Sequence, residues 1–268
     1  MILSVGSTAV LLLGLLAIMA YLAPALLRNA SSRVHSTLLL SAWILHGATL
    51  TASLLNWGQG ARFGFGPAVS VTAWLVLTVY ALELRLYPKL QARWAPSGLG
   101  AVAVLLGLIF PGATMHAQAS VWLPLHWALG IASYGLFAAA VMHAWLMTQS
   151  EQQMRKASAQ DAGVPLMTLE RLMFALIYTG FALLSATLLV GGLFSEYLYG
   201  RGASWKWNHK TVFSVASWII FALLIWARYS LGLRGRKAVN MLYLGAGMLF
   251  LAYIGSRFVI EIILQRSL

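Results

Sequence analysis

The stretch LMFALIYTGFALLSATLLVGGLF, residues 172–194, contains no charged side chain. A helix needs about 20 apolar residues to cross the roughly 30 Å hydrocarbon core of a bilayer. The stretch is continuously apolar and does not alternate between apolar and polar residues, which favours a membrane helix over a strand of a membrane barrel. It therefore predicts an all-α membrane protein.

The composition of the whole chain indicates the same class. Hydrophobic residues make up 60% of the 268 residues and charged residues 9%, and the mean hydropathy is +0.80. This leaves too little polar surface to cover a water-soluble globule of this size. Within one helical domain, residues 1–268, the positions of Arg, Lys, Pro and Gly delimit eight candidate spans: 2–27, 34–55, 68–86, 94–110, 121–147, 172–194, 211–231 and 238–263.

The basic residues predict the orientation of these spans. Twelve of the 18 Lys and Arg residues fall on one set of alternate connections. The positive-inside bias then puts both termini outside the cytoplasm, as expected for a multi-pass protein of a bacterial inner membrane with a tryptophan-rich external loop near 195–210. The net charge of +12 is spread over short clusters, so we expect anionic lipid of the bilayer, and no nucleic acid, as its counterpart.

Several kinds of chemistry are excluded by missing residues. The chain has no cysteine, which excludes disulfides and thiolate metal sites. Glycine-rich phosphate loops, HExxH and the serine-hydrolase elbow are absent, and no two acids sit mid-span at helical spacing. Histidine and tryptophan remain as candidates.

Two histidines lie within predicted spans. His46 is near the middle of the second, and His126 opens the fifth. Haem iron accepts neutral imidazole as an axial ligand, so one hypothesis for both is haem ligation. The alternatives are a hydrogen bond to a neighbouring helix for His46 and an interfacial anchor for His126. His209, in the external loop, is either a ligand or a solvated residue, and we expect His143 to be a packing residue.

The external side also combines cations with indoles. Trp205 and Trp207 alternate in the loop and offer a stacking surface for a flat apolar macrocycle. Arg257 either pairs with Glu261, four residues later, or helps to hold the carboxylates of an anionic ligand. The cations that are candidates for this second role are Arg201, Lys206 and Arg257.

Residues 204–238, SWKWNHKTVFSVASWIIFALLIWARYSLGLRGRKA, resemble the signature of the cytochrome c assembly (CcsA, CcmC, HemX-like) family. That pattern is W-x-W-D-P-K-E-x-W-x-L-x-x-W, then an apolar helix and G-W-R-G-R. HWALGIASYGLF, residues 126–137, is similar to the helix before the signature, and AYIGSRFV, residues 252–259, to the last helix of the short, YpjD-like branch. The matching signature positions are Trp205, Trp207, Lys210, Trp218, Arg228, Gly232, Arg234, Gly235 and Arg236.

The resemblance implies a membrane protein that holds haem b between histidines and presents it at the outer face for attachment to apocytochrome c. His126 would be the external iron ligand and His46 the intramembrane one. Trp205 and Trp207 would form the haem platform. The partners implied are haem and a cytochrome c biogenesis partner or another membrane protein.

The chain departs from the family pattern at several positions. Asn208 and His209 replace the Asp and Pro of the signature, Thr211 its Glu and Phe213 a Trp, while Trp226 takes the place of the helix-terminal histidine. We therefore expect haem binding or relay without full cytochrome c haem lyase activity. The alternative is a haem-free accessory or regulatory membrane subunit of the same fold.

Overall fold

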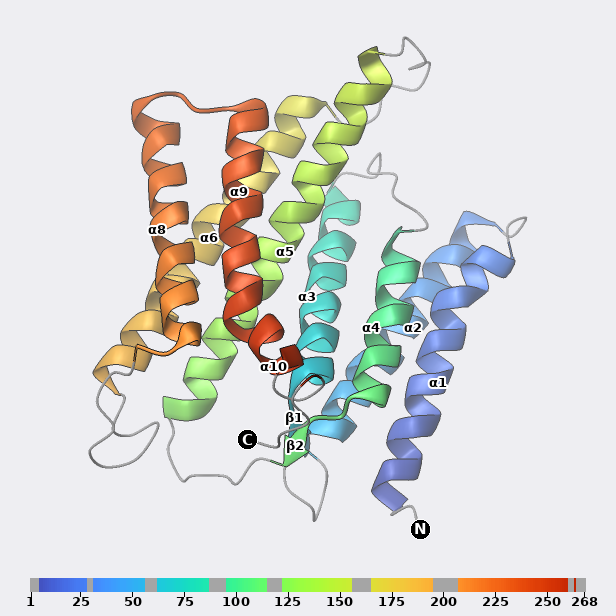
Figure 1. Cartoon of the computed structure of the whole chain (residues 1–268). Helices are drawn as coiled ribbons and strands as arrows, with labels where there is room; N and C mark the ends of the chain where they lie inside the picture. Colours follow the sequence, from blue (N-terminus) through green and yellow to red (C-terminus); the bar gives the residue numbers. More distant parts are fainter. Residues whose placement is uncertain are drawn as a thin grey trace. The chain divides into compact units, whose positions relative to one another are not determined.

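The computed structural model describes residues 5–27, 31–55, 62–86, 95–114, 122–155, 165–194, 207–259 and 263. Nearly all of this part of the chain is helical (Figure 1). The exception is a short antiparallel ladder between β1 (Arg62–Phe63) and β2 (Ala113–Thr114). The predicted all-α class is confirmed, and this two-residue ladder is an addition that hydropathy did not indicate.

Eight long helices in the described ranges coincide with the eight predicted spans. Five are long and apolar enough to cross a bilayer: α3, α5, α6, α8, and α9 with the turn after it. The chain is therefore a multi-pass membrane protein, while a crossing by all eight stays a prediction. The helices are α1 (Val5–Leu26), α2 (Ser32–Leu55), α3 (Phe65–Leu86), α4 (Ala95–Ile109), α5 (Trp122–Arg155), α6 (Leu166–Leu193), α8 (His209–Ser230) and α9 (Gly235–Phe250).

Three helix ends show how the boundaries arise. α4 is the shortest of the eight, as predicted; Pro111 follows it closely, and Gly112 adopts a φ of 78°, which glycine tolerates without steric cost. α5 continues past the predicted span, which ends at 147, to Arg155, as expected from a helix extension at the start of the connection 149–171, and at 34 residues it is about 51 Å long. α9 passes into a π-helical turn, η1 (Leu251–Gly255), and then into α10 (Ser256–Phe258).

The helices belong to two compact units. The first comprises residues 1–78, 92–117 and 257–268, and the second comprises 79–91 and 118–256. In the first unit, α1 and α4 approach closely because Gly100 has no side chain: a Cβ there would lie 2.5 Å from the ring of Tyr21. A single helical domain remains the prediction for the whole chain.

The core of the second unit is built from α5, α6, α8 and α9. Phe137 of α5 and Phe221 of α8 are buried in it. Glycines let the neighbouring helices come close to these rings: Gly180 of α6 lies against Phe137, and Gly245 of α9 lies against Phe221. The result is a layer of two aromatic rings between two bare helix backbones.

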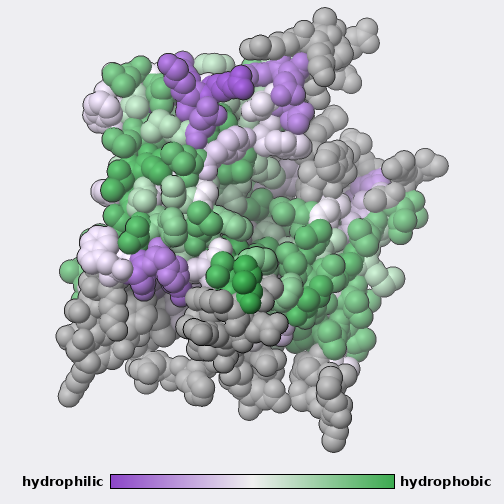
Figure 2. Space-filling view, viewed as in Figure 1, coloured by the Kyte–Doolittle hydropathy of each residue, from purple (hydrophilic) through white to green (hydrophobic). Residues whose placement is uncertain are grey.

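Hydrophilic side chains on the second unit gather in two places in the view of Figure 2. One group covers the turn between α8 and α9, and the other lies over the start of α8, with hydrophobic side chains between them. This distribution is typical of a helix bundle whose middle faces lipid and whose ends face water.

Candidate functional site

His126 lies in the first turns of α5, half-buried against α6. Its Nδ1 is 3.1 Å from the carbonyl oxygen of Thr187. A carbonyl only accepts hydrogen bonds, so Nδ1 carries the proton and Nε2 keeps its lone pair. Within the described residues Nε2 has no hydrogen-bond partner. Of the candidate histidines, His126 therefore offers a nitrogen suited to a metal.

The start of α8 lies at the same end of the second unit as the start of α5, the helix segment that contains His126 (Figure 1). α6 and α8 run antiparallel here, joined by a hydrogen bond of 2.8 Å from the indole of Trp218 to Ser185 Oγ. Trp207, 69% exposed, and His209, also exposed, therefore stand where α6 ends and α5 begins. His209 is the first residue of α8, not part of a loop as predicted.

Asn208 explains why the family signature continues with a helix. It is the N-cap of α8: its Oδ1 accepts hydrogen bonds from the backbone N–H of Thr211, at 3.0 Å, and from the hydroxyl of Thr211, at 3.1 Å. The signature's Asp would cap at this position, and its Pro would occupy the first helical position, where proline is favoured. The departure from Asp to Asn keeps the cap.

His46 is fully buried in the first unit and bonded through both ring nitrogens. Its Nε2 is 2.9 Å from Ser70 Oγ of α3, and its Nδ1 is 3.3 Å from the hydroxyl of Tyr21 of α1. The neighbouring Trp43 stacks on Trp74, with ring centroids 4.8 Å apart. The hydrogen bond to another helix, one of the two hypotheses for His46, is present. Iron ligation stays a prediction that requires the ring to release Ser70 or Tyr21.

Several predicted site residues lie outside the described part of the chain. One tryptophan and two of the basic residues of the external loop are among them, so the distance of these three side chains from His126 is not described, and their place beside it stays a prediction. Arg257 is in α10, but its side chain is not described, nor is its predicted partner Glu261. The residues of the loop concerned are Arg201, Trp205 and Lys206.

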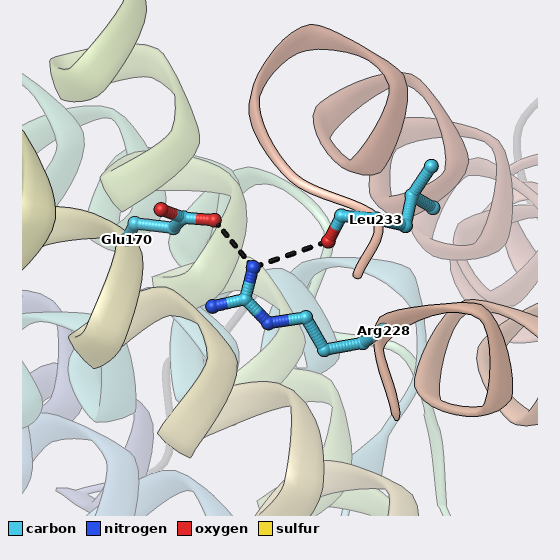
Figure 3. A network of polar contacts seen from close by, with 3 residues as sticks. All are labelled: Glu170, Arg228 and Leu233. Carbon is cyan, nitrogen blue, oxygen red and sulfur yellow. Dashed lines mark hydrogen bonds and ion pairs between the residues drawn. The ribbon is translucent and has the colours of Figure 1, made fainter. Parts of the chain in front are cut away.

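The opposite end of the second unit contains an ion pair that the sequence did not indicate. Arg228 Nη1, at the end of α8, lies 2.8 Å from Glu170 Oε1 of α6 and donates to the carbonyl oxygen of Leu233 at 3.1 Å (Figure 3). The guanidinium group also stacks over Phe174, 4.3 Å from the ring centroid. The only available signal was a carboxylate near a mostly apolar run, which generally needs a partner.

The family motif G-x-R-G-R corresponds to the turn held by this ion pair. Gly232 and Gly235 have φ values of 61° and 60°, in the left-handed region that glycine adopts readily. Leu233 between them turns its carbonyl toward Arg228. Arg228 and these two glycines therefore shape the α8–α9 turn, a structural role for three of the matching signature positions.

The remaining buried histidine, His143, does not belong to either cluster. It is fully buried in α5, and its Nδ1 donates to the carbonyl oxygen of Ala139 in the preceding turn at 2.9 Å. The packing role expected for His143 stays a prediction. Among the described residues, no group of three His, Cys, Asp or Glu side chains is placed to hold a bare metal ion.

The donor set fits haem at His126 better than at His46. An axial ligand of haem iron is a neutral imidazole nitrogen with an open approach. Nε2 of His126 has the lone pair for this role, and the ring is oriented by a carbonyl at its other nitrogen, as ligating histidines commonly are. His46 would first have to break a buried hydrogen bond.

Comparison with known proteins agrees with the resemblance. The model of the family described as Cytochrome C assembly protein matches residues 12–264. The chain is 28% identical over 229 residues to the inner membrane protein YpjD of Escherichia coli K12, covering 83% of this chain and 84% of YpjD. It is 26% identical over 272 residues to the cytochrome c biogenesis protein CcsA of Synechococcus sp. WH7803, with 85% and 82% covered. Since the family match extends from α1 past α10, the chain belongs to the cytochrome c assembly protein family.

Proposed function

We propose that this protein binds haem b, or relays it, at the outer face of a bacterial inner membrane as part of cytochrome c biogenesis. Haem b, when bound, supplies an iron centre that takes an imidazole nitrogen as axial ligand. His126 provides that nitrogen, Nε2. The observation that carries the proposal is the hydrogen bond from Nδ1 to the Thr187 carbonyl, which leaves the lone pair of the neutral ring on Nε2.

The side chains at the start of α8 are of the kinds that bind a porphyrin, which favours a haem site at this end of the second unit. Trp207 is 69% exposed, and an indole presents a flat apolar face for a macrocycle. His209 is a second imidazole on the same short stretch. By the family resemblance, Trp205 extends the platform, and the propionates are held by cations of the external loop and the last helix: Arg201, Lys206 and Arg257.

The orientation follows from the distribution of charge. The end opposite His126 has an exposed basic turn, and the positive-inside bias assigns such a turn to the cytoplasm. His126 then faces the outer side, and the charge distribution of the whole chain predicts extracytoplasmic termini. Two relatives support the compartment and the process by their names, an inner membrane protein and a cytochrome c biogenesis protein. The exposed basic residues of the turn are Arg234, Arg236 and Lys237.

The test is a visible-absorption titration of the full chain, purified in detergent, with haemin. We expect the wild-type protein to develop a Soret band and His126→Ala to bind haemin at least tenfold more weakly. His35→Ala is the control, because His35 already contacts the carbonyls of Ser31 and Pro24 on the first unit. A wild-type protein that stays colourless, or a His126→Ala variant with unchanged affinity, overturns the proposal.

A haem-free accessory or regulatory membrane subunit is the second candidate. One observation favours it: both ring nitrogens of His46, the expected intramembrane ligand, are already hydrogen-bonded. Under this function the fold persists while iron ligation is lost. A wild-type protein that stays colourless with haemin yet remains folded in the same detergent is the result that selects it.

A further inference from the structure

We propose that Gly191 is a positioning residue for His126. The bare backbone of α6 at Gly191 lets the imidazole rest on that helix, with Nδ1 at the Thr187 carbonyl and Nε2 turned away. This inference deepens the proposed haem function and rests on it for its purpose. The geometry itself, however, is a property of the protein without haem.

The space at Gly191 is filled by the imidazole. A Cβ built on Gly191 would lie 3.0 Å from Cε1 of His126 and 3.5 Å from its Nδ1, and the other ring atoms lie beyond 4 Å. Ordinary van der Waals contacts of a Cβ are 3.4 to 4 Å, so any side chain at 191 pushes the ring. Because Nε2 is among the more distant atoms, its lone pair is on the side of the ring away from Gly191.

The contact is part of a register that runs along α5 and α6. One turn after His126, Gly130 faces the Thr187 side chain, with 3.5 Å from its Cβ position to Cγ2. Seven residues later, Phe137 faces Gly180, at 3.2 Å. Each step forward on α5 is matched by an equal step back on α6, as in antiparallel helices packed at regular spacing. The position of His126 over Gly191 is therefore determined by the whole helix pair.

The orientation matters because the two ring nitrogens are not equivalent. With Nδ1–H donated to a carbonyl, the neutral ring has its lone pair at Nε2. A ring displaced from Thr187 can exchange tautomers and present an N–H where a metal needs a lone pair. The hydrogen bond at the far nitrogen also raises the basicity of the ligating one.

The first experiment measures the tautomer of His126 directly. The full chain is labelled with ¹⁵N-histidine and reconstituted in nanodiscs without haem, and its histidine ¹⁵N resonances are recorded by NMR. The wild type is compared with Gly191→Ala and Gly191→Val. The resonances that disappear in His126→Gln are those of His126. Gly247→Ala and Gly247→Val are matched controls, because a Cβ at Gly247 of α9 meets nothing within 4 Å. We expect Nδ1–H in the wild type and both controls, with a growing fraction of Nε2–H from alanine to valine at 191.

The second experiment measures the haemin affinity of the wild type, of the two variants at position 191 and of the two control variants at position 247. We expect at least tenfold weaker binding in Gly191→Val, a smaller loss in Gly191→Ala, and no change in the controls. Alanine is a better helix former than glycine, so loss of the α6 helix does not account for an effect of Gly191→Ala.

The two experiments separate this inference from the proposed function. If the wild type binds no haemin but the tautomer still depends on residue 191, the proposed function fails and the positioning role stands. If His126 keeps the same tautomer in Gly191→Val, the positioning role is overturned, whatever the haemin affinity.

Discussion

Phe137 of α5 and Phe221 of α8 stack face to face, with ring centroids 3.9 Å apart and an angle of 4° between the ring planes. The pair lies between two glycines on the helices either side, Gly180 and Gly245. Four helices of the second unit therefore meet at this pair of rings. The two rings fill the space between α6 and α9, and a side chain at either glycine would push against them. This layer also maintains the α5–α6 register on which the position of His126 depends.

Gly245→Ala tests that layer. The new Cβ would lie 2.9 Å from two atoms of the Phe221 ring, so we expect overpacking to lower the free energy of unfolding by about 1 to 3 kcal/mol. Thermal unfolding of the purified protein in one detergent measures the change. Gly247→Ala, two residues later in open space, should be neutral or stabilising by up to about 1 kcal/mol. Equal destabilisation by the two variants would contradict the packing argument.

Glu170→Gln tests the ion pair with Arg228. The two side chains are 10% and 20% exposed, so removing the carboxylate charge leaves a largely buried guanidinium without its counter-charge. We expect a loss of about 2 kcal/mol in the free energy of unfolding, below the range for fully buried pairs because Leu233 still accepts a hydrogen bond. Arg236→Gln, on the exposed side of α9, is the control and should change stability little. A double-mutant cycle with Arg228→Gln should show coupling between the two positions.

Ser70→Ala tests the hydrogen bond to His46. It leaves Nε2 of a fully buried imidazole without its partner, which should cost about 1 to 3 kcal/mol of stability. Ser41→Ala on the exposed side of α2 is the matched control, since Ser41 donates only to the carbonyl of Thr37 in its own helix. Haemin affinity of Ser70→Ala should equal that of the wild type. A tenfold change in that affinity would instead support His46 as an iron ligand.

Asn208→Ala tests the cap of α8. Without Oδ1, the N–H of Thr211 loses the acceptor that Asn208 provides, and the first turn should be destabilised by about 1 kcal/mol. Hydrogen exchange at the Thr211 amide should become faster, while exchange in the middle of α8 stays unchanged. Asn208→Asp, the residue of the family signature, should keep slow exchange, because a carboxylate caps as well as an amide. Fast exchange in Asn208→Asp would show that the amide has some other role.

The helices could be predicted closely because each depends on a local property. α2 ends at Leu55 and α3 at Leu86, as predicted, and α4 stops just before Pro111. The length of an apolar run and the charges or prolines that follow it are sufficient for this. α6 is one exception: it begins at Leu166, six residues before the predicted span, close to the helix start that Thr168 indicates, and this places Glu170 inside the helix.

That exception has a tertiary cause. Glu170 can lie within the helix since Arg228, 58 residues later, neutralises it. A single sequence shows six acids and 18 basic residues, but not which of them pair. The same holds for His46, whose two hydroxyl partners come from helices on either side of it in the chain.

Hydropathy and residue type are properties of short segments, and they were sufficient to predict the membrane class, the eight helices and His126 as a candidate ligand. Which nitrogen of His126 keeps its lone pair is a property of the packed structure. That depends on a backbone carbonyl at Thr187 and on the absence of a side chain at Gly191, one glycine among 24. Neither has a local signature, because a carbonyl is common to every residue and the space beside a glycine exists only once two helices have packed.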